Sequence, residues 1–194
     1  MRYAILFVTL AAVGCGGATY TPTLDYLVDP ALHVQKAPNK TDISLGLRPL
    51  ESANPGLKSM SYTEDGVTLQ QYPNAQWADA PRDVVMRALS DALSMTGHFH
   101  DVGNAADMAT PDWTLTGTLR KYYEDRSGKS PQAVCEISLD VRADNGAKPV
   151  YSAILKNTVP MEGDTPAEFA KAMEKAVADV AQQAAQALAA KQAP

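Results

Sequence analysis

Apolar and polar residues alternate along several segments of the chain, which is the pattern of strands that bury one face. The first of these segments covers residues 43–47. Two more runs, 57–62 and 67–72, flank Asp65-Gly66, and an Asp-Gly pair between two such runs predicts a hairpin. The early part of the chain is therefore expected to form three short strands.

Three longer strands are predicted at 113–123, 134–142 and 150–159. In the second, apolar residues occupy every other position, which is typical of an antiparallel sheet with one solvated face. In the first, the same alternation places the odd-numbered residues on one face, with Lys121 and Tyr123 at its end. An Asn-Gly pair is expected to turn the chain between the last two strands.

Two amphipathic helices are predicted from apolar residues that recur every three or four positions. The first begins at Pro81 and ends at Gly97. The second begins with a capping box at Thr165 and continues for about 25 residues, or roughly 38 Å. That is longer than one sheet face needs, so its C-terminal half is expected to project beyond the sheet. The order of elements predicts an α+β fold, with a mostly antiparallel sheet and two helices packed on one face.

The N-terminus has the features of a bacterial lipoprotein signal peptide. Arg2 precedes the apolar run 3–13, which is too short to span a bilayer. Small residues before Cys15 give a signal peptidase access to that bond, although Ala12 stands where Leu is usual. We therefore expect cleavage before Cys15 and acyl chains on its sulfur that hold the chain on a membrane. Gly16 stands where lipoproteins retained in the enterobacterial inner membrane carry Asp, which favours the periplasmic face of the outer membrane.

Three regions are expected along the chain: a signal peptide at 1–14, a lipidated N-terminus and tether at 15–41, and a single α+β domain at 42–194. The tether is rich in Gly, Thr, Pro, Asn and Lys, and a flexible segment of about 25 residues has a reach of roughly 25–30 Å. Within it, residues 24–28 are apolar enough to pack on the domain as a short edge strand.

Charge and composition exclude some classes of partner. The whole chain carries a net charge of −5, and loss of Arg2 with the leader makes the remainder more acidic. Phosphate backbones need a basic face, so no nucleic acid is expected as a partner. Cys135 has no second cysteine to pair with once Cys15 is acylated, so it is expected to be a buried free thiol.

No catalytic, metal or cofactor motif stands out, and the protein is expected not to be an enzyme. His98 and His100 have a spacing that a metal can use, but no third ligand accompanies them. Ser127-Gly128-Lys129-Ser130 lacks the earlier glycine of a phosphate-binding loop and is interpreted as a strand connection. The acidic pairs Glu64-Asp65 and Glu124-Asp125 are interpreted as solvated turn residues.

Candidate contact residues for a partner or a lipid are aromatic and apolar side chains, because such side chains anchor interfaces. They are Trp77, Tyr122, Tyr123, Val180 and Leu188. The alternative for each of them is a place in the hydrophobic core.

Several segments resemble the ABC-type transport auxiliary lipoprotein family. The similarity begins at Gln76-Trp77-Ala78-Asp79-Ala80-Pro81 and continues through the following helix to Thr96-Gly97-His98-Phe99. It includes the segment 113–119, the strand 133–140 and the helix that starts near Phe169, and it covers roughly residues 43–190.

This resemblance implies a non-catalytic lipoprotein that accompanies an ABC ATPase, a permease and a membrane-anchored Mce-domain protein. Such systems move phospholipid or other hydrophobic molecules between the two membranes of Gram-negative cells, and some members look able to form rings, which implies self-association. Two alternatives stay open: a lipid-binding carrier lipoprotein, and a lipoprotein activator or adaptor of a cell-wall synthesis complex.

Overall fold

The computed structural model describes residues 21–52 and 58–191, so the expected signal peptide and Cys15 lie outside the described residues. Nine strands, two α-helices and one short 3-10 turn follow one another in this part of the chain. They are β1 (Leu24–Tyr26), β2 (Ser44–Leu47), β3 (Glu51–Ser52), β4 (Ser59–Thr63), β5 (Gln70–Trp77), α1 (Pro81–Met95), β6 (Asp101–Asn104), β7 (Trp113–Asp125), β8 (Gln132–Ala143), η1 (Asp144–Gly146), β9 (Lys148–Pro160) and α2 (Pro166–Ala189).

The long strands β7, β8 and β9 form an antiparallel meander, as the sequence predicts. The expectation of a mostly antiparallel sheet is confirmed, because the long ladders of β7, β8 and β9 are antiparallel, but the sheet is mixed rather than purely antiparallel. On the other edge of β7, the short strands β2, β3 and β4 all pair with it in parallel. At the margins of the sheet, β6 pairs in parallel with β2, and β1 pairs in parallel with β5. The strands β4 and β5 form the predicted antiparallel hairpin. The helix α1 provides the crossover that parallel neighbours require, since it lies between β2–β4 and β7 in the chain.

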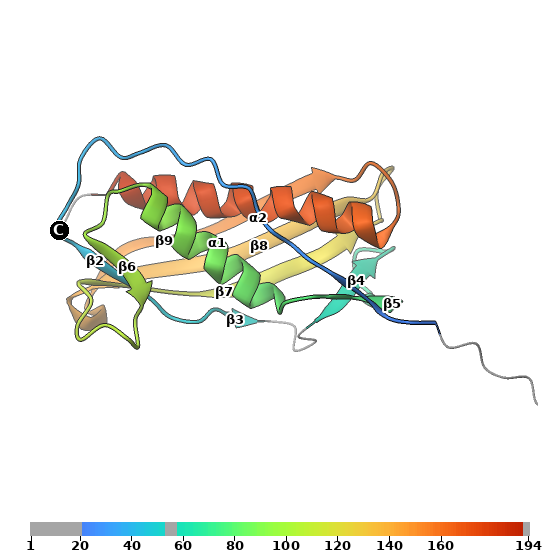
Figure 1. Cartoon of the computed structure of the whole chain (residues 1–194), viewed down its shortest axis with the longest axis horizontal. Helices are drawn as coiled ribbons and strands as arrows, with labels where there is room; N and C mark the ends of the chain where they lie inside the picture. The colour runs from blue at the N-terminus through green and yellow to red at the C-terminus, as the bar shows by residue number, and fades with distance from the viewer. Residues whose placement is uncertain (1–20, 53–57, 192–194) are drawn as a thin grey trace, which may run out of the picture.

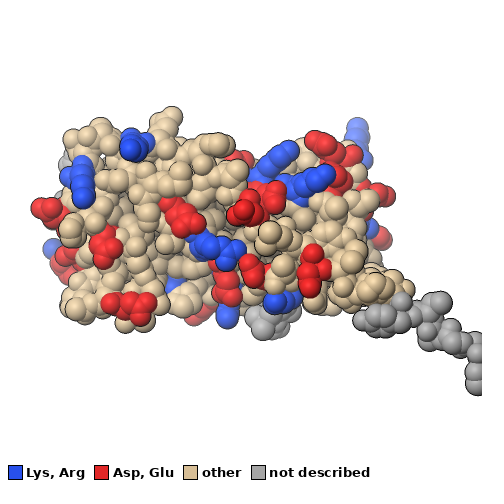
Figure 2. All heavy atoms as spheres, viewed as in Figure 1, with Lys and Arg blue, Asp and Glu red and all other residues tan. Residues whose placement is uncertain are grey.

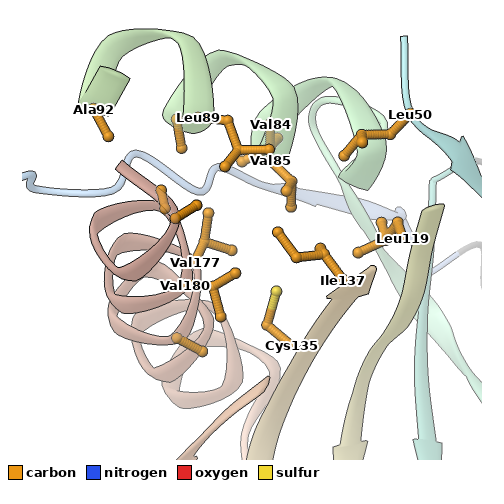
Figure 3. Packing of buried hydrophobic residues seen from close by; sticks show 14 of the residues in the cluster. Leu50, Val84, Val85, Leu89, Ala92, Leu119, Cys135, Ile137, Val177 and Val180 are labelled. Carbon is orange, nitrogen blue, oxygen red and sulfur yellow. The ribbon is translucent and has the colours of Figure 1, made fainter. Parts of the chain in front are cut away.

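Both helices lie on the same face of this sheet, which confirms the predicted α+β architecture (Figure 1). Their apolar stripes meet the inward residues of the sheet, and Figure 3 shows Val85 and Leu89 of α1, Val177 of α2 and Ile137 of β8 pointing into one common core. The C-terminal half of α2 does not project beyond the sheet. Leu188, near its end, has no exposed surface.

The predicted signals mark the ends of both helices. At the start of α2, the side chain of Thr165 accepts a hydrogen bond from the backbone N–H of Glu168, which is half of the capping box. After α1, Gly97 adopts a positive φ of 64°, a conformation that glycine reaches without steric cost.

A β-bulge in β7 changes which side chains face the core. The register with β8 shifts between Leu119 and Lys121, so Tyr122 pairs with the inward residue Cys135. Lys121 and Tyr123 therefore lie on the face opposite the helices, whereas strict alternation predicts them on the core face. One extra residue in a strand is enough to exchange its two faces.

The segment expected to be a tether packs on the domain from Leu24 onward. β1 pairs with β5, as the apolar patch at 24–28 suggested, and the side chain of Val28 is buried. The backbone then follows the helices (Figure 1), where the N–H of His33 donates to Gln182 Oε1 at 3.0 Å and the N–H of Ala37 donates to the Thr96 carbonyl at 2.8 Å. The packed domain therefore includes residues 24–41.

Candidate docking surface

Three of the five candidate contact residues lie in the core. Trp77 at the end of β5 and Val180 and Leu188 on the inner side of α2 are buried. The indole of Trp77 packs against Phe169 and Tyr122, with ring centroids 5.1 and 5.3 Å apart. A docked partner would not reach these three side chains while the core stays closed.

The other two candidates, Tyr122 and Tyr123, are half-buried and line a groove beside the bulge of β7. Along this edge of β7, β3 pairs as far as Leu119 and β4 pairs only from Glu124 onward. The residues between these two points therefore have no strand partner on that side among the described residues.

This bulge groove has a volume of about 380 Å³. It is walled by β4, β5, the bulge of β7 and the first turn of α1. The lining residues are Ser52, Ser59, Ser61, Leu69, Gln71, Ala80, Pro81, Arg82, Leu119, Arg120, Lys121, Tyr122 and Tyr123. Hydroxyl, amide and cationic groups beside two aromatic rings suit the binding of a polar peptide or a carbonyl-bearing group.

Two of the three cations that line the groove are held by a carboxylate on the neighbouring strand. Glu136 of β8 is almost fully buried and accepts from Arg120 Nε and Lys121 Nζ, each at 3.0 Å. The hydrogen bond to Glu136 raises the pKa of Lys121 above its ordinary value. Two cations share one anion, so the rim of the groove keeps a local positive charge.

The face of the sheet opposite the helices is buried near the bulge, at Val134 and Glu136, and more exposed along the rest of the meander. On the meander it carries the side chains that alternate with the core residues, among them Ser138, Asp140, Ser152 and Lys156. Ile154 in the middle of β9 is a large apolar side chain in this polar field and is 59% exposed. The opposite side of the molecule, shown in Figure 2, mixes acidic and basic side chains without a large patch of one sign.

A buried ionic cluster near the groove, formed by Glu124, Arg126 and Tyr72, was not predicted from the sequence. Glu124, expected to be a solvated turn acid, has no exposed surface and accepts from Arg126 Nε at 2.7 Å. The hydroxyl of Tyr72 bonds to both of these residues, and the Arg126 guanidinium lies 4.2 Å from the centre of the Tyr62 ring. Burial, together with the bond to Glu124, raises the pKa of Tyr72 above its ordinary range. These contacts join β4, β5 and β7, so the cluster has a structural role.

The histidines considered as metal ligands and the segment 127–130, considered as a phosphate-binding loop, have structural positions in the fold. His98 is buried and its Nδ1 lies 2.9 Å from the Asn39 carbonyl, while His100 is exposed. Residues 127–130 form the connection between β7 and β8, as expected. Among residues 21–52 and 58–191, no group of three or more His, Cys, Asp or Glu side chains is placed to hold a metal ion. Within the same described ranges, no helix has the length and apolar character needed to span a membrane.

Cys135 is fully buried and free, as the sequence predicts, and burial raises the pKa of its thiol to about 12.

Comparison with solved structures identifies the fold. A Xanthomonas campestris protein of the family DUF330 is 20% identical, with a TM-score of 0.73 over 84% of this chain and 92% of its own. A second, uncharacterised protein is 14% identical, with a TM-score of 0.61 over 80% of this chain and 97% of its own. At these identities the likeness concerns the fold alone. No curated protein matches the sequence.

The family comparison covers most of the molecule. A family model described as "ABC-type transport auxiliary lipoprotein component" matches residues 26–185, from β1 almost to the end of α2. This range confirms the resemblance seen in the sequence and extends it to the N-terminal strand. The chain therefore belongs to the ABC-type transport auxiliary lipoprotein family.

Proposed function

We propose that this protein is a non-catalytic, lipid-anchored adaptor of an Mce-associated ABC transporter, which moves phospholipid or other hydrophobic molecules across the Gram-negative envelope. The observation that carries this proposal is the family match over residues 26–185. The partners would be the Mce-domain protein of the periplasm and, through it, the permease and its ATPase. Acyl chains on Cys15 would hold the adaptor at the periplasmic face of a membrane, with the outer membrane favoured by Gly16.

The packing of the core supports an adaptor over a lipid carrier. A carrier needs an apolar cavity for an acyl chain, and the natural place for one is the layer between the helices and the sheet. That layer is filled by large side chains with at most 2% of their surface exposed, among them Trp113, Phe169 and Met173. Figure 3 shows Val177, Val180 and Ile137 packed in the same layer. Opening this core for a lipid would separate α2 from the strands on which it packs.

The surface chemistry is suited to protein docking. The bulge groove and the adjoining sheet face combine hydroxyl groups, paired charges with one excess cation, and half-buried aromatic rings, which is a composition common at specific interfaces. Tyr123 lies where these two surfaces meet, because it lines the groove and points away from the helices. We therefore place the contact with the Mce-domain protein around Tyr123.

Site-specific photo-cross-linking in intact cells tests this placement. Tyr123→p-benzoylphenylalanine in the full chain should form a cross-link to the Mce-domain protein encoded beside it, detected by mass spectrometry. Met95→p-benzoylphenylalanine is the matched control, because Met95 is exposed at the far end of α1. It should give little or none of the same product.

Other outcomes would contradict the proposal. Equal cross-linking from both positions would reject the placement around Tyr123. Cross-links to a peptidoglycan synthase in place of transport proteins would favour the cell-wall alternative. Phospholipid that co-purifies with the protein after the Cys15→Ser substitution, at one molecule per chain, would favour the carrier.

A further inference from the structure

The β4–β5 hairpin ends in an exposed apolar tip, formed by residues 64–69. Val67 is 88% exposed and Leu69 is 48% exposed. Val67 brings the fold almost no packing energy, and Leu69, at the edge of the bulge groove, keeps about half of its surface in contact with water. The tip therefore offers an apolar surface to a partner outside the domain.

The conformation of the tip is fixed by one carboxylate. Asp65 Oδ1 accepts from the backbone N–H groups of Val67 and Thr68 at 2.8 and 2.6 Å, and its Oδ2 accepts from the Thr68 hydroxyl at 2.8 Å. These bonds hold the pKa of Asp65 well below its usual range. Gly66 supplies the positive φ of the turn, at 76°. Val67 therefore points outward from a turn that the Asp65 side chain holds in one conformation.

The N-terminus leaves the domain toward the same end. β1 is parallel to β5, with Leu24 opposite Ala75, so the chain before Leu24 extends toward the start of β5 and hence toward the tip. Figure 1 shows the dark blue N-terminal segment leaving the molecule beside β4 and β5, opposite the C-terminus. Cys15 is six residues before Thr21, so the Cα atoms of these two residues lie within about 22 Å of each other.

From these observations we propose that the tip rests on the membrane that holds the acylated Cys15, with Val67 and Leu69 inserted at the level of the lipid headgroups. The inference rests on the proposed lipid anchor. The anchor fixes the distance to the bilayer, and the tip adds a second contact that sets the orientation of the domain. The long axis of the meander would then point away from the membrane, with the β8–β9 turn farthest from it.

The charges of the tip specify the kind of lipid surface. Glu64 and Asp65 are both acidic and lie next to the apolar residues. Carboxylates are repelled by anionic lipids, so a zwitterionic surface is the better partner.

Depth-dependent fluorescence quenching tests the proposal with the full, lipidated chain in phosphatidylcholine vesicles. An environment-sensitive fluorophore is attached at Val67→Cys and, as the matched control, at Met95→Cys at the opposite end of the molecule. The buried thiol of Cys135 will not compete for the label, and the sulfur of Cys15 is already acylated. Doxyl groups placed near the headgroups should quench the fluorophore at position 67 several-fold more than the one at position 95.

Replacement of part of the phosphatidylcholine by phosphatidylglycerol should weaken quenching at position 67. A chain that floats with the vesicles but is quenched equally at both positions would overturn the proposal and leave the lipid anchor intact. A chain that does not float with the vesicles would overturn both. Cross-linking of Tyr123 to the transporter is measured separately, so failure of the adaptor hypothesis would be recognised independently.

Discussion

At the scale of single residues, the burial of Glu124 differs most from what its local sequence predicts. Glu124 follows directly after Tyr123 at the end of a strand and is followed by Asp125, which is the composition of a solvated turn. In the structure β7 continues to Asp125, and the bulge turns Glu124 toward the core. A carboxylate without exposed surface is stable there only because Arg126 and Tyr72 bond to it.

Glu124→Gln should lower the free energy of unfolding by about 2–3 kcal/mol, because Arg126 would lose the anion that balances its partly buried charge. Urea unfolding followed by circular dichroism measures the change. Glu64→Gln is the control, since Glu64 is exposed in the hairpin and should change stability by less than about 0.5 kcal/mol. If the two variants were equally stable, the cluster would contribute nothing to the joining of β4, β5 and β7.

At the scale of elements, local signals were sufficient for the helices and the long strands. Pro81, Gly97 and the capping box at Thr165 act within one or two turns of the chain, so they are visible in the sequence. The bulge after Leu119 and the parallel pairs of β2, β3 and β4 depend on contacts with distant strands, and no local pattern encodes them.

Gly117 in β7 is needed where strands approach closely. A Cβ atom at this position would lie 2.3 Å from the backbone carbonyl oxygen of Ser138 on β8. Gly117→Ala should therefore destabilise the fold by about 1–3 kcal/mol. Gly103→Ala in β6 is the matched control, because no atom lies within 4 Å of its added Cβ. Comparison of the two urea midpoints gives the result, and equal midpoints would mean that β7 and β8 move apart without cost.

The candidate surface was predictable only in part. Tyr122 and Tyr123 were selected because aromatic residues are frequent at interfaces; both line the groove, and their contact with a partner stays a prediction. The same criterion selected Trp77, which belongs to the core, since sequence cannot separate an aromatic anchor from a core aromatic without the fold. Arg120 and Lys121 stayed unnoticed because Glu136, which gathers them, lies on the next strand.

At the scale of the whole molecule, the N-terminal segment belongs to the packed domain. Tyr26, Leu32 and Val34 contact the core in addition to the buried Val28. The expected tether at 15–41 is therefore not a free segment from Leu24 onward. With the lipid anchor that we propose at Cys15, the domain would lie close to the bilayer, and a partner would meet it within a few nanometres of the membrane.

A chain shortened to residues 42–194 should be less stable than one comprising residues 21–194, by at least about 2 kcal/mol, because it lacks β1 and exposes the surface that Val28 covers. Urea denaturation of the two soluble chains measures the difference. Identical midpoints would show that residues 21–41 add nothing to the fold, and a domain boundary at 42 would then stand.

The place of α2 at the end of the chain has a consequence for biogenesis. α2 follows all the other described elements in the chain, yet it contributes twelve buried residues, from Phe169 to Leu188, to the core. Because a ribosome makes the chain from its N-terminus, this core cannot close before α2 has been made. With the signal peptide that we propose, such late closure would keep the chain unfolded and competent for secretion until α2 has crossed the membrane.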